Sequence, residues 1–145
     1  KLYFHGPSFQ VLESAQARQG TLLGKFNKKL IQIAVDETSR FATPLLIEMC
    51  FQTAGLYEAG ATGTLALPQS VGTLKLFKQQ LNGLAIYAEV KPRQEGEKYT
   101  FDARVVDAKG NVFLELTDYR TVALPYQAEE QLLAPLKKLA VAANE

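Results

Sequence analysis

One carboxylate lies in the middle of an apolar stretch of the chain, and one amide follows it four residues later. The stretch is TPLLIEMCFQTAG, residues 43–55, in which the acid is Glu48 and the amide is Gln52. In a helix, residues four apart lie on the same face, so both side chains would point into the same space. A charged carboxylate in apolar surroundings is costly unless it is paired or stays protonated, and a protonated carboxyl is what a catalytic acid needs. Glu48 is therefore a candidate catalytic acid, and the alternative is a carboxylate that pairs with a buried cation or reaches the helix end.

A buried helix is the element that must position this acid, because the stretch is apolar nearly all round. Its other faces carry seven apolar side chains: Leu45, Leu46, Ile47, Met49, Cys50, Phe51 and Leu56. Pro44 suits the first turn of such a helix, where its missing N–H costs nothing. Gly60 and Gly63 are expected to end the helical region.

Beyond the helix the apolar residues recur with a period of two, which predicts strands. Strands are expected within residues 84–91, 99–105 and 112–116, with a hairpin turn from Asp107 to Asn111 between the last two. Residues 64–77 supply one or two more strands, bent at Pro68 and Gly72, and residues 8–26 one or two broken at Gly20. The final segment, 127–145, is a terminal helix or a linker, interrupted or restarted at Pro135.

One buried helix followed by antiparallel strands is an α+β arrangement in which the sheet must wrap the helix. A curved antiparallel sheet around a long central helix is the hotdog fold, and residues 1–126 are expected to form it. Such a unit leaves a sheet edge near Glu48 uncovered, so it is expected to pair with a second unit or to form a homodimer.

Composition supports one compact domain and excludes several function classes. The 145 residues are 47% apolar, and 16 basic residues nearly balance 15 acidic ones, so nothing global points to nucleic acid. No apolar run reaches the roughly 18 residues that span a bilayer. The single cysteine, Cys50, is expected to pack rather than react, and together with the lack of a secretion signal it predicts a cytoplasmic location. No metal-ligand spacing or phosphate-binding glycine loop is present, so neither a metal nor another cofactor is expected.

Three segments of the chain resemble, in order and spacing, the second hotdog half of dehydratase domains. They are LYFHGPSFQ, PLLIEMCFQTAG and LTDYRTVALP, and together they extend from residue 2 to about residue 125. The related domains occur in polyketide synthases and polyunsaturated fatty acid synthases. The helix also looks like the active-site helix of bacterial 3-hydroxyacyl-carrier-protein dehydratases, in which the acid is Glu.

The resemblance implies elimination of water from a 3-hydroxyacyl thioester to give the trans-2-enoyl thioester. The substrate would be carried on the phosphopantetheine of an acyl carrier protein, with no further cofactor. In the family, a histidine base removes the α proton and a carboxylic acid protonates the leaving hydroxyl. Glu48 matches that acid, and Gln52 matches the residue that hydrogen-bonds and orients it.

The chain departs from the family in two ways. The polyketide enzymes typically have Asp where this chain has Glu48, which keeps the acid and lengthens its reach by one methylene. The family's base lies in a motif of His, three residues, Gly, four residues and Pro, which this chain lacks. The only histidine, His5, matches a Tyr of the second-half loop, and the interval used in single-hotdog dehydratases leads from Glu48 to Ala34. The base is therefore expected from a His-bearing hotdog half.

Several other residues are candidates for substrate binding. Tyr3, Phe9 and Phe51 are expected to be core residues or walls of an acyl tunnel. His5 either lines the pocket beside Gly6 and Pro7, caps a turn, or serves as a base recruited late. Arg120 is expected to be a partner of Asp118 or a residue at the pocket edge. A basic cluster, Lys25, Lys28 and Lys29, is either a solvated loop or a binding site for an acidic carrier protein.

Three hypotheses of function remain at this point. The first is the acid-bearing half of a dehydratase, inactive when isolated because the base is absent. The second is a non-catalytic hotdog module that binds acyl chains or supports dimerisation. The third is a hotdog thioesterase, against which the FHGPSFQ loop argues because that loop belongs to the dehydratase type.

Overall fold

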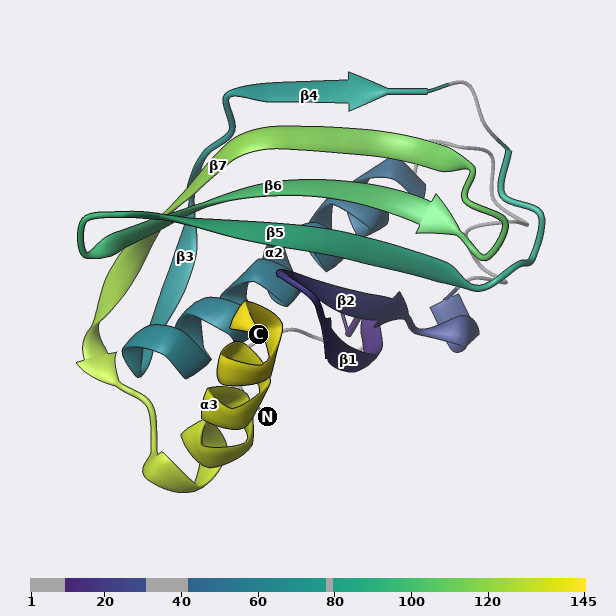
Figure 1. The fold of residues 1–145 in the computed structure, drawn as a ribbon. Helices are drawn as coiled ribbons and strands as arrows, with labels where there is room; N and C mark the ends of the chain where they lie inside the picture. Colours follow the sequence, from purple (N-terminus) through teal and green to yellow (C-terminus); the bar gives the residue numbers. More distant parts are fainter. Residues whose placement is uncertain (1–9, 31–41, 78–79) are drawn as a thin grey trace.

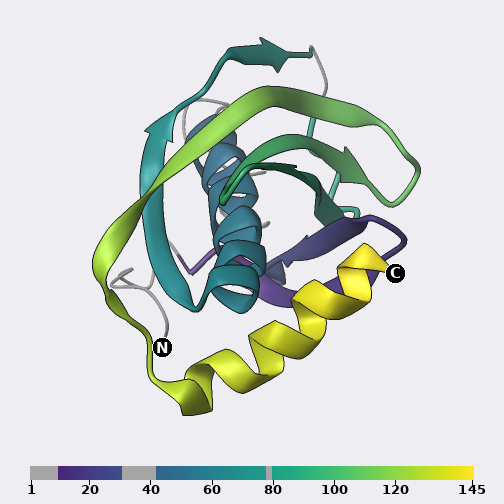
Figure 2. The same cartoon turned by 60° about the vertical axis from the view of Figure 1, so that its left-hand side comes forward.

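The structure, a computed structural model, describes residues 10–30, 42–77 and 80–145. Within these residues a single antiparallel sheet curls around one long helix (Figures 1 and 2). The strands are β1 Leu12–Arg18, β2 Thr21–Phe26, β3 Thr64–Ser70, β4 Thr73–Leu76, β5 Ile86–Glu95, β6 Lys98–Asp107 and β7 Val112–Gln127. Their order is β1-β2-β5-β6-β7-β3, and β4 also pairs with β7. The expected α+β architecture, a curved sheet around a central helix, is confirmed.

Helix α2, Ala42–Thr62, is the central helix, and the sheet covers it on several sides. Its buried residues are spread around the helix, as the apolar sequence predicts. The chain leaves the helix at Gly63, which has a φ of 78° and donates its N–H to the carbonyl oxygen of Ala59 at 2.9 Å. On the sheet side, a Cβ atom at Gly24 of β2 would lie 2.0 Å from Thr53 Oγ1, so only glycine allows the helix to approach this closely.

The strands with a period of two are confirmed, and their apolar residues face α2. Ile86, Ala88 and Val90 of β5 are buried, as are Phe101 and Val105 of β6. The predicted hairpin joins β6 to β7: Asp107 Oδ1 accepts hydrogen bonds from the backbone N–H groups of Lys109 and Asn111 at 2.8 and 3.0 Å. Before the helix, β1 and β2 meet at Gly20, which has a φ of 77°.

Strand β3 is irregular at a predicted bend, whereas β7 extends well beyond its predicted end. Strand β3 continues through Pro68 with an irregular pairing between Pro68 and Ser70, and the chain passes from β3 to β4 at Gly72. Strand β7 is much longer than residues 112–116, because its first part pairs with β4 and its second part with β3. The polar residues of LTDYR interrupt the alternation of apolar and polar residues, so the sequence does not indicate that β7 continues beyond residue 116.

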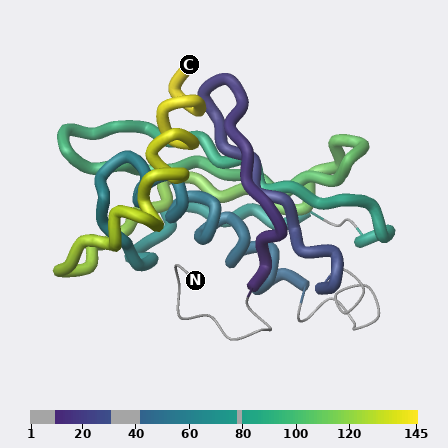
Figure 3. Tube along the Cα trace, turned by 90° about the horizontal axis from the view of Figure 1, so that it is seen from below, coloured from purple at the N-terminus to yellow at the C-terminus, as the bar shows by residue number. Residues whose placement is uncertain are grey.

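The C-terminal residues form helix α3, Glu130–Asn144, with Pro135 inside it. This helix lies against the C-terminal half of α2 and reaches the turn between β1 and β2, where Gly20 N–H donates to the carbonyl oxygen of Ala143 at 2.7 Å (Figure 3). Tyr57 of α2 donates its hydroxyl to Asn144 Oδ1 at 2.9 Å. Within the described ranges, no helix combines the length and the apolar character needed to cross a lipid bilayer.

Candidate functional site

Glu48 and Gln52 are hydrogen-bonded to each other on α2. Gln52 Nε2 donates to Glu48 Oε1 at 2.9 Å, and both side chains are half-buried. The spacing of four residues produces this contact, as the sequence predicts. An amide donor at one carboxyl oxygen holds the group in one orientation.

The pair lines a small pocket between α2 and the β3–β7 edge of the sheet. The pocket has a volume of about 50 Å³ and is bounded by Glu48, Phe51, Gln52, Ala66, Leu67, Pro68 and Tyr119. Apart from Glu48 and Gln52, these side chains are apolar or aromatic. Pockets for small molecules usually measure roughly 300–1,000 Å³. The described part of the chain therefore forms only a small pocket beside Glu48.

An aromatic pair forms one wall of this pocket. The rings of Phe51 on α2 and Tyr119 on β7 stack with their centroids 4.5 Å apart and their planes 21° from parallel. Phe51 was among the residues expected to line an acyl tunnel, and the structure places it in the lining of the Glu48 pocket. Tyr119 is only 2% exposed and was missed, because the strand was expected to end before it.

A second acid on α2, Glu58, was also missed. Glu58 is 8% exposed, and Thr121 Oγ1 of β7 lies 2.7 Å from its Oε2 and 2.9 Å from its Oε1 as the hydrogen-bond donor. Burial raises the pKa of the Glu58 carboxyl, and the hydrogen bond from Thr121 lowers it in part. Glu58 does not line the Glu48 pocket. The signal in the sequence was a second carboxylate before the glycines that end the helix.

We expect Glu58→Gln to change how stability depends on pH. Because the folded pKa of Glu58 is raised above 4.5, its ordinary value, the wild-type chain loses stability as the pH rises through that folded pKa. Glutamine cannot ionise, so the stability of the variant relative to wild type should increase from acidic to neutral pH. Urea unfolding at several pH values measures this difference. Glu97→Gln, at an exposed position in the β5–β6 turn, is the control and should show no such trend.

The other polar and reactive candidates are either buried in the core or paired with a neighbouring charge. Cys50 is 1% exposed, and burial raises the pKa of its thiol, so it packs in the core and is not a nucleophile. Arg120 Nη2 lies 3.1 Å from Asp118 Oδ1, as expected. Lys25 of the basic cluster pairs with Glu13 at 3.4 Å. Among the described residues, no group of three or more His, Cys, Asp or Glu side chains could hold a metal ion.

Five of the predicted substrate-binding residues lie outside the described residues. They are Tyr3, His5, Gly6, Pro7 and Phe9. Their roles stay predictions.

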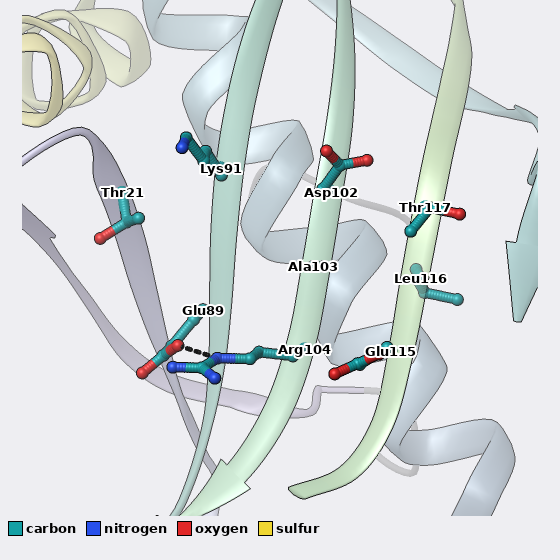
Figure 4. A pocket seen from close by; sticks show the side chains of 9 residues that line it. All are labelled: Thr21, Glu89, Lys91, Asp102, Ala103, Arg104, Glu115, Leu116 and Thr117. Atoms are coloured by element: carbon teal, nitrogen blue, oxygen red, sulfur yellow. Dashed lines mark hydrogen bonds and ion pairs between the residues drawn. The ribbon is translucent and has the colours of Figure 1, made fainter. Parts of the chain in front are cut away.

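A larger hollow of about 290 Å³ lies on the outer face of the sheet, away from α2 (Figure 4). Most side chains around it are charged or hydroxylated: Thr21, Glu89, Lys91, Asp102, Arg104, Glu115 and Thr117, above Ala103 and Leu116. Glu89, Arg104 and Glu115 are neighbours across β5, β6 and β7, and Arg104 forms an ion pair with Glu89. Alternating charges that neutralise each other are typical of a solvated sheet face. The hollow shares no lining residue with the Glu48 pocket, so the two are separate.

Comparisons with known proteins support the resemblance to polyketide synthase dehydratase domains. A family model described as the polyketide synthase dehydratase N-terminal domain matches residues 1–131. No curated protein matches the chain by sequence.

Three solved structures illustrate the likeness in fold. The dehydratase domain from the CurF module of curacin polyketide synthase is 27% identical with a TM-score of 0.60, and the match covers 83% of this chain and 42% of that one. The dehydratase domain of a mycocerosic acid synthase-like polyketide synthase is 20% identical with a TM-score of 0.60, covering 88% and 45%. The PaaI protein of E. coli is 11% identical with a TM-score of 0.57, covering 75% and 76%. The chain thus spans less than half the length of the two matched dehydratase chains.

Proposed function

The chain belongs to the family of polyketide synthase dehydratase domains, with a hotdog fold, and from this premise we propose that it is the acid-bearing half of a 3-hydroxyacyl-thioester dehydratase. The observation that carries the proposal is the hydrogen bond from Gln52 to Glu48 at the wall of an apolar pocket. This is the geometry that a general acid requires, because the carboxyl is oriented by a neighbour and shielded by apolar groups. The substrate would be a 3-hydroxyacyl chain on the phosphopantetheine of an acyl carrier protein, in polyketide or fatty acid synthesis.

Glu48 would act on the hydroxyl group that leaves. As a base removes a proton from C2, the C–H electron pair forms the new double bond and the bond between C3 and oxygen breaks. The Glu48 proton passes to the departing oxygen, which leaves as water. Gln52 donates a hydrogen bond to Oε1, which fixes the orientation of the acid in the wall of the pocket. Exchange with solvent returns the proton from the base to Glu48 and completes the cycle.

The base would come from a second hotdog half that carries a histidine. His5 is the only histidine in the sequence, and it is not part of the family's base motif. Two matched structures are inactive mutants of the CurK dehydratase, one with a histidine replaced and one with an aspartate replaced. These variants support a division of the chemistry between a histidine and an acid, with Glu48 in the acid's role. We assign the chain to the second half because it has the acid motif and lacks the base motif.

An uncovered apolar edge supports pairing with that second half. Leu74 and Leu76 of β4 lie opposite Leu116 and Leu114 of β7, whose side chains are buried, yet they are 45% and 56% exposed themselves. Leu67, in the wall of the Glu48 pocket, is 46% exposed. This edge, β3 and β4 in Figure 1, is where a partner would cover apolar surface and enlarge the pocket. In the absence of the His-bearing half, a second copy of the chain would cover it as a homodimer.

The matched dehydratase chains are more than twice as long as the region that this chain covers, so we place the chain and its His-bearing half in one longer polypeptide, the parent polypeptide. The proposed function is tested with this parent polypeptide. A 3-hydroxyacyl thioester on a carrier protein is the substrate, and mass spectrometry of the carrier-bound acyl group is the measurement. We expect loss of one water from the acyl group, with the thioester intact. Release of the free 3-hydroxy acid would instead identify a thioesterase, and an unchanged acyl group would identify a non-catalytic hotdog module. Either result would overturn the proposal.

A further inference from the structure

Strand β7 contains a bulge just before the aromatic residue of the Glu48 pocket. Across the β6–β7 pair, Ala103 lies opposite Leu116 and Phe101 lies opposite Tyr119. One residue of β6, Asp102, therefore faces two residues of β7, Thr117 and Asp118. Asp118 has a φ of 55°, in the left-handed region that residues other than glycine rarely adopt. One extra residue with a positive φ is the signature of a β-bulge.

Hydrogen bonds from two other segments hold this bulge in place. The backbone N–H of Asp118 donates to Asp102 Oδ1 at 3.0 Å. The backbone N–H of Gly72 lies within 3.0 Å of the Thr117 carbonyl oxygen and 3.2 Å of the Asp118 carbonyl oxygen, and donates to both. Arg93 of β5 contacts Asp102 through an ion pair of 3.2 Å. The bulge is therefore fixed by the neighbouring strand and by the β3–β4 turn.

The bulge decides which face of the sheet Tyr119 occupies. In a regular strand, alternate residues share a face, so a buried Leu116 would be followed by a buried residue 118 and an outward residue 119. Because of the extra residue, both Leu116 and Tyr119 are buried, at 1% and 2% exposure, although they are three positions apart. Tyr119 thereby reaches Phe51 of α2 and lines the Glu48 pocket.

We infer that Tyr119 is a specificity-determining residue that limits the size of the acyl group beside Glu48, and that Asp102 and Asp118 are its positioning residues. The inference rests on the proposed function. The pocket of about 50 Å³ has room for little more than a small group next to the acid, and the stacked rings of Tyr119 and Phe51 form its aromatic wall. Removing the Tyr119 ring would open space for a larger acyl substituent. Loss of the bulge would do the same, because it would turn the ring out of the pocket.

The specificity role is tested by Tyr119→Ala in the parent polypeptide. We expect kcat/KM for a long or branched 3-hydroxyacyl thioester, relative to a short one, to rise at least about 10-fold, since one methylene in a pocket changes discrimination by about 10- to 200-fold. Tyr126→Ala is the matched control, because Tyr126 is on the same strand and 48% exposed, and its ratio should equal that of wild type. An unchanged ratio in Tyr119→Ala would overturn the specificity role.

The positioning role is tested by pairs of variants that keep or remove the bulge. Asp118→Gly permits the positive φ and Asp102→Asn keeps an oxygen acceptor, so both should retain the wild-type ratio. Asp118→Val and Asp102→Leu should shift the ratio as Tyr119→Ala does, at unchanged far-ultraviolet circular dichroism. If all four variants keep the wild-type ratio, the positioning role is wrong.

An independent measurement separates this inference from the proposed function. In the substrate-free 145-residue chain, NMR should show ring-current shifts between Phe51 and Tyr119 that persist in Asp118→Gly and Asp102→Asn and disappear in Asp118→Val and Asp102→Leu. Ring-current shifts that persist in all four folded variants would overturn the positioning role, whether or not the parent polypeptide is an active dehydratase. If the parent polypeptide dehydrates no thioester, the proposed function and the specificity role fail together, while the NMR result still decides the positioning role.

Discussion

Glu48→Gln in the parent polypeptide should lower the rate of dehydration about 100- to 10,000-fold with little change in fold. This is the contribution that a positioned general acid usually makes. Glutamine has nearly the same shape and can still accept the hydrogen bond from Gln52, but it has no acidic proton for the leaving hydroxyl. Single-turnover formation of the enoyl thioester measures the chemical step, and thermal unfolding verifies that the fold is retained.

The second acid of α2 provides a matched control for this experiment. Glu58→Gln makes the same chemical change on the same helix, at a carboxyl that is bonded to Thr121 and lies outside the Glu48 pocket. We expect its dehydration rate to stay close to that of wild type. If Glu58→Gln loses activity and Glu48→Gln keeps it, the acid has been assigned to the wrong residue.

The fold and the core of the candidate site could be predicted from the sequence because both depend on local patterns. The apolar character of residues 43–55 predicts a buried helix, and the period of two predicts the strands that follow it. The contact between Glu48 and Gln52 follows from a spacing of four residues within one helix, and needs no other element.

Tyr119 and Glu58 could not be predicted because their surroundings depend on contacts between distant segments. Tyr119 is buried only because Asp102, 16 positions from Asp118 in the sequence, holds the bulge that turns it inward. Glu58 is satisfied by Thr121, 63 positions away. One local signal was available: Asp is disfavoured inside strands and tolerates a positive φ better than most residues, so the Asp of LTDYR indicates an irregular strand.

The chain on its own should form a dimer and still fail to dehydrate a 3-hydroxyacyl thioester. The exposed leucines of β3 and β4 favour association, and a symmetric pair of copies would cover them by joining the two edges. Such a dimer would contain two Glu48 acids and no histidine in the family's base motif. We therefore expect its rate to be about 100- to 10,000-fold below that of the two joined halves, the loss expected when a general base is missing.

Two measurements on the isolated chain decide this prediction. Sedimentation at micromolar concentration should show a dimer, and a stable monomer would contradict the role assigned to the β3–β4 edge. Mass spectrometry of the acyl thioester should show no loss of water above the background rate, and His5→Ala should leave that background unchanged. Rapid dehydration by the isolated chain that His5→Ala abolishes would instead make His5 the base. The site would then be complete within copies of a single chain, and no His-bearing half would be needed.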